Sequence, residues 1–315
     1  MALLTPFLFD EARAVVADYG IDLARLTPLE AGSVNSNFLL EAVHGTRYFA
    51  RIYEEQGAAG AEFELQLNET LAHRRVPVAR PLRRKSGDLV AFTSGKPFAV
   101  YEHIPGEVLC QKRVTPEVTR AVGEALARVH TVDLGGLHVP EGRFDFDGLR
   151  ARLDRVDASE RASLIEPVRR IRALLDELER TRTPNLPHGL IHGDLFRDNV
   201  LVDGSRIVAL LDFESACQGN YVYDLAVTLL AWCMGDVLDP TLFQPMIEGY
   251  ETVRPLTAAE RAAFVTEASI ACARFATTRL TDFTLRVPEG EKPPRDYGRF
   301  LDRLEAVRAG VLGIV

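Results

Sequence analysis

Apolar residues recur with two different periods along the chain, and the change of period divides it into two parts. From Leu26 to Val100, short apolar runs are separated by Gly, Asn and Ser, which is typical of strands in an antiparallel sheet. These runs read FLLEAV, RYFARIY, DLVAF and PFAVYEHI. A helix is predicted among them at residues 61–75, where the spacing becomes helical until the prolines of VPVARP end it. Another is predicted at residues 7–19, before Gly20.

Helical periodicity dominates after the IPGE segment. The predicted helices span residues 115–130, 145–156, 160–181, 222–235, 257–282 and 295–310. Two β-like runs, NVLVDG and RIVALLDF, flank a turn at Asp203–Gly204 and predict a hairpin. A chain of 315 residues is long for one core. We therefore expect an α+β fold with two lobes: an antiparallel-sheet lobe at residues 1–104 and a mainly helical lobe at residues 105–315.

Composition narrows the class of protein. With 47% hydrophobic and 26% charged residues, the chain has the make-up of an ordinary globular protein. A net charge of −8 and a pI near 5.5 disfavour nucleic acid or an anionic membrane as partner and favour a small molecule. The four cysteines are scattered without a CxxC pair, so we expect no cysteine metal site. Neither a signal peptide nor a charge-free run of bilayer length is apparent, which predicts a cytoplasmic protein. The oligomeric state stays open.

The most specific segment is HGDLFRDNVLVDGSRIVALLDFE, residues 192–214, which places Asp194, Asn199 and Asp212 around the predicted hairpin. An Asp followed five residues later by Asn, and then by a strand-borne Asp, is the spacing of kinase-type phosphoryl transfer. Asn199 and Asp212 can supply oxygen ligands that bridge a Mg²⁺ ion to the phosphates of ATP. Asp194 would orient the acceptor hydroxyl and accept its proton. Each fragment alone would also fit a turn or a helix cap, but the three together favour catalysis.

This segment resembles the Brenner-type motif of the aminoglycoside phosphotransferases, choline kinases and homoserine kinases, and the resemblance extends over nearly the whole chain. It implies a bilobal, protein-kinase-like fold with ATP bound between the lobes. It also implies that Asp194 is the catalytic aspartate, that Asn199 and Asp212 bind magnesium, and that His192 braces the loop.

The same resemblance assigns the nucleotide-binding residues. The LEAGSVNSNF segment lacks the Walker pattern, but a turn of this composition between strands can present backbone N–H groups to phosphates. The candidates there are Gly32, Ser33, Asn35 and Asn37. Where the family commonly has a phosphate-contacting lysine, this chain has Arg51, a planar cation that is no geometric copy of an ammonium.

The partner of Arg51 and the hinge between the lobes complete this set. Glu64 is the best match for the helix glutamate that pairs with the strand cation, with Glu62 and Glu69 as rivals. The KPFAVYEHIPG segment resembles the hinge, where backbone groups of Glu102 and Ile104 would pair with adenine.

The segments expected to form the acceptor pocket resemble those of homoserine kinases more than those of antibiotic kinases. These segments are FRDN after HGDL, and ACQGNYVYDLAVTLLAWC. Homoserine carries a carboxylate, so its pocket should offer an arginine, and Arg197, Arg274 and Arg279 are candidates. Trp232 either lines that pocket or packs in the core. The resemblance thus implies ATP-dependent phosphorylation of L-homoserine for threonine biosynthesis. The same chemistry on choline, ethanolamine, a sugar or an aminoglycoside, and a non-catalytic nucleotide-binding pseudokinase, remain alternatives.

Overall fold

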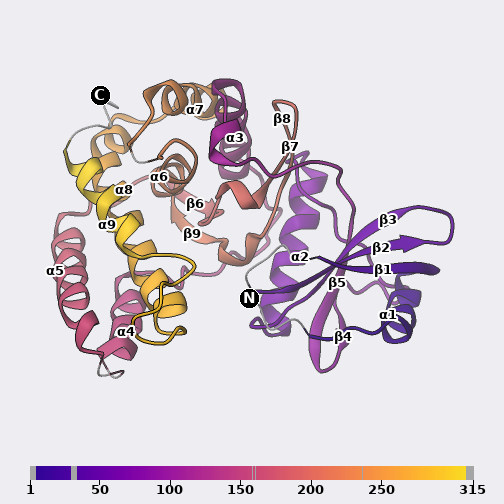
Figure 1. The fold of residues 1–315 in the computed structure, drawn as a ribbon. Coiled ribbons are helices and arrows are strands. Elements are labelled where there is room, and N and C mark those ends of the chain that lie inside the picture. The colour runs from indigo at the N-terminus through magenta and orange to yellow at the C-terminus, as the bar shows by residue number, and fades with distance from the viewer. Residues whose placement is uncertain (1–4, 30–33, 158, 160, 236, 310–315) are drawn as a thin grey trace. The chain divides into compact units, whose positions relative to one another are not determined.

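A five-stranded antiparallel sheet organises the N-terminal part of the chain (Figure 1). The computed structural model describes residues 5–29, 34–157, 159, 161–235 and 237–309. In sequence order the strands are β1 (Leu23–Leu29), β2 (Ser36–Ala42), β3 (Arg47–Ile52), β4 (Ala91–Thr93) and β5 (Lys96–Glu102). In the sheet they follow the order β1-β2-β3-β5-β4. Two helices belong to this part, α1 (Phe9–Val16) and α2 (Ala58–His73).

The sheet is covered on both faces because successive side chains of a strand point to opposite sides. On β5, Val100 belongs to the apolar cluster that contains Val16 of α1. The next residue, Tyr101, belongs to a second cluster that contains Leu65 of α2. The predicted sheet and both predicted helices are therefore present, and β1, whose Pro28 obscured its pattern, is an addition.

The described chain divides into two compact units. The first comprises Met1–Val108, Val132–His138 and Asn199–Glu214; the second comprises Leu109–Thr131, Val139–Asp198 and Ser215–Val315. The α+β prediction, with sheet first and helices after, is confirmed.

The predicted division into two lobes at residues 104–105 is incomplete, because later segments of the chain also belong to the first unit. The hairpin of β7 (Val200–Asp203) and β8 (Arg206–Leu210) was expected in the helical lobe. Glu107 and Val202 instead exchange two backbone hydrogen bonds of 3.0 and 2.9 Å, and the Leu210 N–H donates to the Pro77 carbonyl at 2.7 Å. These long-range bonds, which no local pattern encodes, place the hairpin in the first unit.

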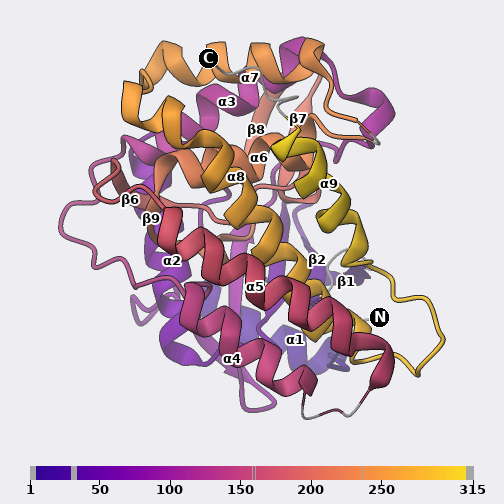
Figure 2. The ribbon, with the colours of Figure 1, turned by 90° about the vertical axis from the view of Figure 1, so that its left-hand side faces the viewer.

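The second unit is mainly helical (Figure 2). Its helices are α3 (Pro116–His130), α4 (Phe146–Asp157), α5 (Ile165–Thr181), α6 (Tyr221–Trp232), α7 (Pro240–Val253), α8 (Ala258–Arg279) and α9 (Gly298–Arg308). A π-helical turn, Leu280–Thr284, extends α8. Strands β6 (His188–Ile191) and β9 (Cys217–Asn220) pair in antiparallel fashion. The sequence did not predict β6, β9 or α7; Pro245 inside α7 breaks the helical signal there.

Helix α8 is the central helix of this unit. It begins with a capping box between Thr257 and Glu260 and packs against α5, α6 and α9 (Figure 2). From Ala268 to Thr278 every residue is buried. A charged residue in this stretch, such as Arg274, is therefore held in one place by its surroundings.

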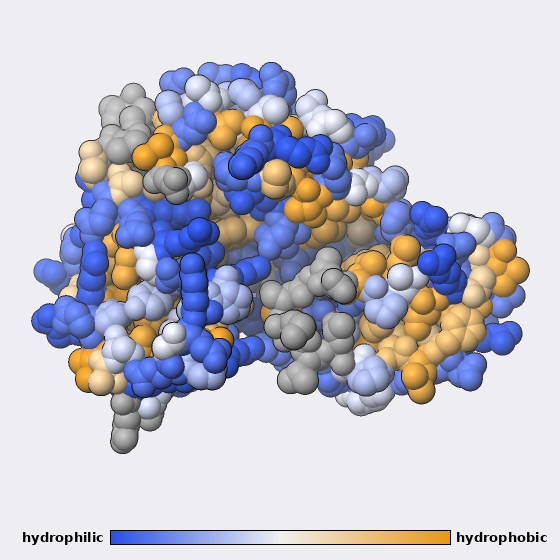
Figure 3. Space-filling view, in the orientation of Figure 1, coloured by the Kyte–Doolittle hydropathy of each residue, from blue (hydrophilic) through white to orange (hydrophobic). Residues whose placement is uncertain are grey.

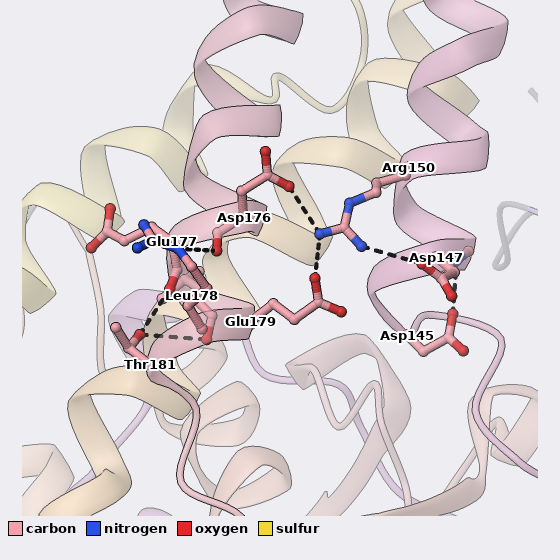
Figure 4. A network of polar contacts seen from close by, with 10 residues as sticks. Asp145, Asp147, Arg150, Asp176, Glu177, Leu178, Glu179 and Thr181 are labelled. Atoms are coloured by element: carbon pink, nitrogen blue, oxygen red, sulfur yellow. Dashed lines mark hydrogen bonds and ion pairs between the residues drawn. The ribbon is translucent and has the colours of Figure 1, made fainter.

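Ion pairs join the more exposed helices. Arg150 on α4 contacts Asp176 and Glu179 on α5 and also Asp147 on its own helix (Figure 4). Hydrophilic residues cover much of the outer surface of these helices (Figure 3). Because the carboxylates are exposed, each pair contributes only about 0–1 kcal/mol, and burial of the apolar faces holds the helices together. Within the described residues, no helix is both long and apolar enough to cross a membrane.

Candidate active site

In the first unit, the guanidinium of Arg51 lies among polar side chains from three separate segments of the chain. Its Nη1 atom is 3.4 Å from Glu64 Oε1 on α2 and 3.4 Å from Asp212 Oδ1 after β8. Its Nε atom donates to Asn37 Oδ1 on β2 at 3.3 Å. Arg51 is only 9% exposed and Glu64 only 2%. The structure thus brings together four of the residues that the sequence selected.

The charges of this cluster depend on one another. Burial opposes the charged form of Arg51, but the carboxylates of Asp212 and Glu64 overcome it and raise its pKa. Burial likewise raises the pKa of Glu64, and Arg51 opposes that rise. Glu64 Oε2 is buried without a hydrogen-bond partner in the described part of the chain. Arg51 is therefore a fixed cation whose position depends on buried Glu64; the rivals Glu62 and Glu69 make other contacts.

Asn199 and Asp212 occupy the two adjoining ends of the β7–β8 hairpin. Asn199 ends a 3-10 turn directly before β7, and its carbonyl accepts from the Leu211 N–H at 2.9 Å. Asp212 follows with φ of 65°, a left-handed conformation that Asp tolerates better than most residues. The hairpin register therefore sets the spacing of these two residues.

The oxygen donors at the hairpin fit a magnesium ion. Across the described residues, no group of three or more His, Cys, Asp or Glu side chains could hold a metal. One carboxylate and one amide oxygen suit Mg²⁺, which keeps several waters and takes further ligands from phosphates. The side chain of Asp212 is 35% exposed, so its carboxylate is accessible.

The predicted nucleotide-binding loop is described in part. Gly32 and Ser33 lie outside the described residues. Asn35 and Asn37 are 5% and 6% exposed. The side chain of Asn35 accepts from the Glu54 N–H at 3.1 Å and donates to Glu214. Asn35 therefore links the end of β3 to the segment that follows Asp212.

At the predicted hinge, Glu102 ends β5 and its N–H donates to the Arg80 carbonyl at 2.9 Å. The N–H of Glu102 is thus engaged by the protein itself. Ile104 lines a cavity of about 540 Å³. Its other lining residues are Pro105, Gly106, Asp203, Arg206, Ile207 and Val208.

In the second unit, the carboxylate of Asp224 holds the loop that carries Asp194. It accepts the backbone N–H groups of His192 at 2.7 Å and Gly193 at 2.8 Å, and it lies 3.0 Å from Nε2 of His130. Burial acts to raise the pKa of Asp224, but His130 and His192 lower it overall. Asp224 is consequently an anion that fixes the loop.

Gly193 and His130 also help to fix the conformation of this loop. Gly193 has φ of 75°, and a Cβ atom there would lie 2.9 Å from the Ser215 carbonyl, so other residues do not fit. His130 ends α3 and contacts the Tyr250 hydroxyl at 2.7 Å. The sequence did not single out His130, because nothing local distinguishes it from any other histidine near a helix end.

Among the predicted acceptor residues, Arg274 contacts Asp194. Its Nη1 atom is 3.2 Å from Asp194 Oδ1. Its guanidinium carbon lies 4.2 Å from the ring centre of Phe144 and 3.8 Å from that of Phe275. The sequence did not single out Phe144, which precedes α4 in the chain and reaches Arg274 only through the fold.

The other predicted acceptor residues bind protein groups. Nη1 of Arg197 donates to Gln111 and, at 2.6 Å, to the Ala231 carbonyl. Nη1 of Arg279 donates to the Asp296 carbonyl at 3.0 Å. Arg197 thus ties the loop after Asp194 to the end of α6.

Trp232 lies in the core. It is 0% exposed, and its indole N–H donates to the Leu195 carbonyl at 3.1 Å. Of the two sequence readings, the structure favours packing, with Trp232 supporting the backbone next to Asp194.

A family model described as "Phosphotransferase enzyme family" matches residues 25–264. The chain belongs to this family. The matched span contains Arg51, Asp194, Asn199 and Asp212, and the resemblance inferred from the sequence is confirmed.

Curated relatives of this phosphotransferase carry the name homoserine kinase. The protein of Neisseria meningitidis serogroup B is 35% identical over 289 residues, covering 90% of this chain and 92% of its own. That of Methylobacillus flagellatus is 31% identical over 323 residues, covering 100% and 98%. The similarity thus extends over both units.

Solved structures share the fold at low identity. An ethanolamine kinase of Plasmodium vivax superposes with a TM-score of 0.68 at 16% identity, covering 97% of this chain and 90% of that one. An amicoumacin kinase in complex with AMP-PNP, Ca²⁺ and Ami gives a TM-score of 0.65 at 16% identity, covering 96% of each chain. At such identities the likeness establishes the fold only.

Proposed function

We propose that this phosphotransferase transfers the γ-phosphoryl group of ATP to the hydroxyl of L-homoserine, giving O-phospho-L-homoserine for threonine biosynthesis. The observation that supports this substrate is the similarity to curated homoserine kinases, which covers nearly the whole chain at 31–35% identity. It includes the helical unit, where Asp194 and Arg274 lie.

On the nucleotide side, Arg51 is proposed to contact the phosphates of ATP. Glu64 is proposed to orient Arg51, which its burial and its contact with Nη1 support. The backbone around Gly32, Ser33, Asn35 and Asn37 is proposed to bind phosphate oxygens. The Glu102 carbonyl and the Ile104 N–H are proposed to pair with adenine.

Asn199 and Asp212 are proposed to hold a Mg²⁺ ion. Bound there, the ion would neutralise the negative charge that develops on the phosphates. The hairpin keeps the amide and the carboxylate at a fixed spacing, and the Arg51 guanidinium lies 3.4 Å from the Asp212 carboxylate.

Asp194 is proposed to orient the acceptor hydroxyl and to accept its proton as the phosphoryl group is transferred. Asp224 and Gly193 support this role because they fix the loop conformation. Arg274 beside Asp194 makes the site unfavourable for a polycation such as an aminoglycoside. The acceptor chemistry of the site therefore favours an anionic or zwitterionic molecule.

We further propose that the protein works in the cytoplasm on small molecules, without a nucleic-acid or membrane partner. Its net charge of −8 supports this, because nucleic acids and most membrane surfaces are anionic.

The substrate is tested by ADP release from purified protein with ATP, Mg²⁺ and single acceptors. L-Homoserine should give the highest kcat/KM of a panel that includes choline, ethanolamine, a sugar and an aminoglycoside. Asp194→Ala should lower kcat by about 10²–10⁴-fold while the Kd for a non-hydrolysable ATP analogue changes little. Turnover of another acceptor but none of homoserine would refute the substrate, and full activity of the variant would refute the role of Asp194.

A further inference from the structure

Arg274 differs from the other acceptor-side arginines in what its guanidinium contacts. Arg197 and Arg279 each donate to a backbone carbonyl, so Nη1 of each is engaged by the protein itself. Nη1 of Arg274 instead donates to the carboxylate of Asp194, at 3.2 Å. Of these three arginines, Arg274 is thus the one within reach of an acceptor whose hydroxyl lies at Asp194.

Packing fixes the plane of this guanidinium. Arg274 is 4% exposed, and the rings of Phe144 and Phe275 lie over its guanidinium carbon at 4.2 and 3.8 Å. An arginine stacked on aromatic rings presents its donors only along the edges of its plane. The orientation of the fork is therefore set before any ligand arrives.

The donors of Arg274 are not all used. Nε is buried and has no hydrogen-bond partner in the described part of the chain. Nη2 likewise donates to none of the described residues. Nε and Nη2 form one edge of the guanidinium, and two parallel donors on one edge match the two oxygens of a carboxylate. A buried donor without a partner is unfavourable, and a ligand that accepts from it relieves that cost.

We propose that the Nε–Nη2 edge of Arg274 binds the carboxylate of the acceptor and thereby selects hydroxy amino acids over hydroxyl compounds that lack a carboxylate. This inference rests on the proposed function. In extended homoserine the hydroxyl oxygen and the carboxyl carbon are separated by about 5 Å. One guanidinium can therefore contact Asp194 through Nη1 and the acceptor carboxylate through its other edge. Arg274 then sets the distance between the acceptor and the group that receives its proton.

The test compares acceptors with and without the carboxylate. L-Homoserine and 4-hydroxybutyrate carry it, whereas 3-aminopropan-1-ol is homoserine without it. For each acceptor, kcat and KM are measured for the wild type, Arg274→Gln and Arg274→Lys. The matched control is Arg261→Gln, which removes an exposed arginine of the same helix that pairs with Glu251. The Kd of each acceptor is also measured calorimetrically with a non-hydrolysable ATP analogue.

Arg274→Gln should lower kcat/KM for homoserine and 4-hydroxybutyrate by a factor about 100 times larger than the factor by which it lowers kcat/KM for 3-aminopropan-1-ol. Arg274→Lys keeps the positive charge but not the fork, so KM for homoserine should rise about 10-fold or more while KM for 3-aminopropan-1-ol rises by a smaller factor. Arg261→Gln should behave as the wild type. The folding of Arg274→Gln is checked by its melting temperature and its Kd for the ATP analogue. If this variant does not fold, Arg274→Lys and the calorimetric Kd values test the contact with the carboxylate.

The inference and the proposed function fail in different ways. If the wild type does not phosphorylate homoserine, the proposed function is wrong. If it does, but the Arg274 variants lose the same factor for all three acceptors, or lose kcat alone with unchanged Kd values, Arg274 acts only on Asp194 and does not bind the carboxylate.

Discussion

At the scale of single residues, Arg51 shows how a departure from a family pattern can be accommodated. A lysine is common at this strand position in the family that the sequence resembles, but an arginine is longer and carries donors in several directions. Here those donors reach Glu64 and Asp212 through Nη1 and Asn37 through Nε. Arg51 thereby also neutralises the buried Glu64, so the residue serves stability as well as the proposed contact with phosphate.

Replacing Arg51 should therefore affect both properties. Arg51→Gln leaves Glu64 buried without its cation, which should lower the free energy of unfolding by about 3–5 kcal/mol, measured by urea denaturation. KM for ATP should rise at least about 10-fold, with little change in KM for homoserine. The control Arg47→Gln removes an arginine of the same strand that is 57% exposed and should change neither quantity.

A double variant separates the two effects of Arg51. Arg51→Gln with Glu64→Gln removes the buried charge as well, so stability should return towards the wild type while KM for ATP stays high. Recovery of both quantities would contradict a contact between Arg51 and the nucleotide.

At the scale of elements, the packing of α3 against α7 depends on two glycines. A Cβ atom at Gly123 on α3 would lie 2.0 Å from the Met246 carbonyl oxygen, and one at Gly249 on α7 would lie 2.1 Å from that of Arg120. The backbones of the two helices thus meet without side chains between them. This contact matters for the site because α3 ends at His130, which contacts Asp224 behind the Asp194 loop.

Gly123→Ala should force the two helices apart and lower the free energy of unfolding by about 2–3 kcal/mol, measured by urea denaturation. The control is Gly60→Ala on α2, whose Cβ would meet only the flexible Gln56 side chain, at 3.3 Å. Because alanine favours a helix over glycine, that variant should be unchanged or more stable by up to about 1 kcal/mol. Equal effects of the two substitutions would contradict the close backbone contact.

At the scale of the whole molecule, the response to acid depends on a partly buried carboxylate that ties distant segments together. Glu54 accepts hydrogen bonds from Thr5, Ser36 and Lys96, which come from three separate parts of the first unit. Burial acts to raise the pKa of Glu54, but these hydrogen bonds outweigh it and lower the pKa to about 2, from 4.5 for the free side chain. A carboxyl group whose pKa is lower in the folded state stabilises the fold only while it is ionised.

The contribution of Glu54 should therefore be complete above pH 4.5 and disappear as the pH falls towards 2. Because Lys96 is 38% exposed, we expect about 1–2 kcal/mol at neutral pH. The free energy of unfolding of the wild type and of Glu54→Gln, measured in urea from pH 7 to pH 3, should differ at pH 7 and converge in acid. A difference that stays constant over this range would contradict the assignment.

The sequence predicted the elements with a clear period and missed those whose signal is weak. The sheet strands and most helices lie within a few residues of their predicted positions, because alternating and helical spacing reflect a buried face. Strand β1 contains Pro28 and helix α7 contains Pro245, and proline argues locally against both kinds of element. Their burial against neighbouring elements outweighs that local preference.

The sequence by itself determined the fold class and supplied the candidates for the catalytic and metal-binding groups, because Asp194, Asn199 and Asp212 stand close together on one segment. Only the tertiary structure decided which distant residues complete the site. It brought Glu64 and Asp212 to Arg51, His130 to the Asp194 loop, and Phe144 to Arg274. These contacts join residues that are far apart in the chain. Hydrogen-bonding geometry and packing in the folded protein select such partners, so the local spacing of residues cannot predict them.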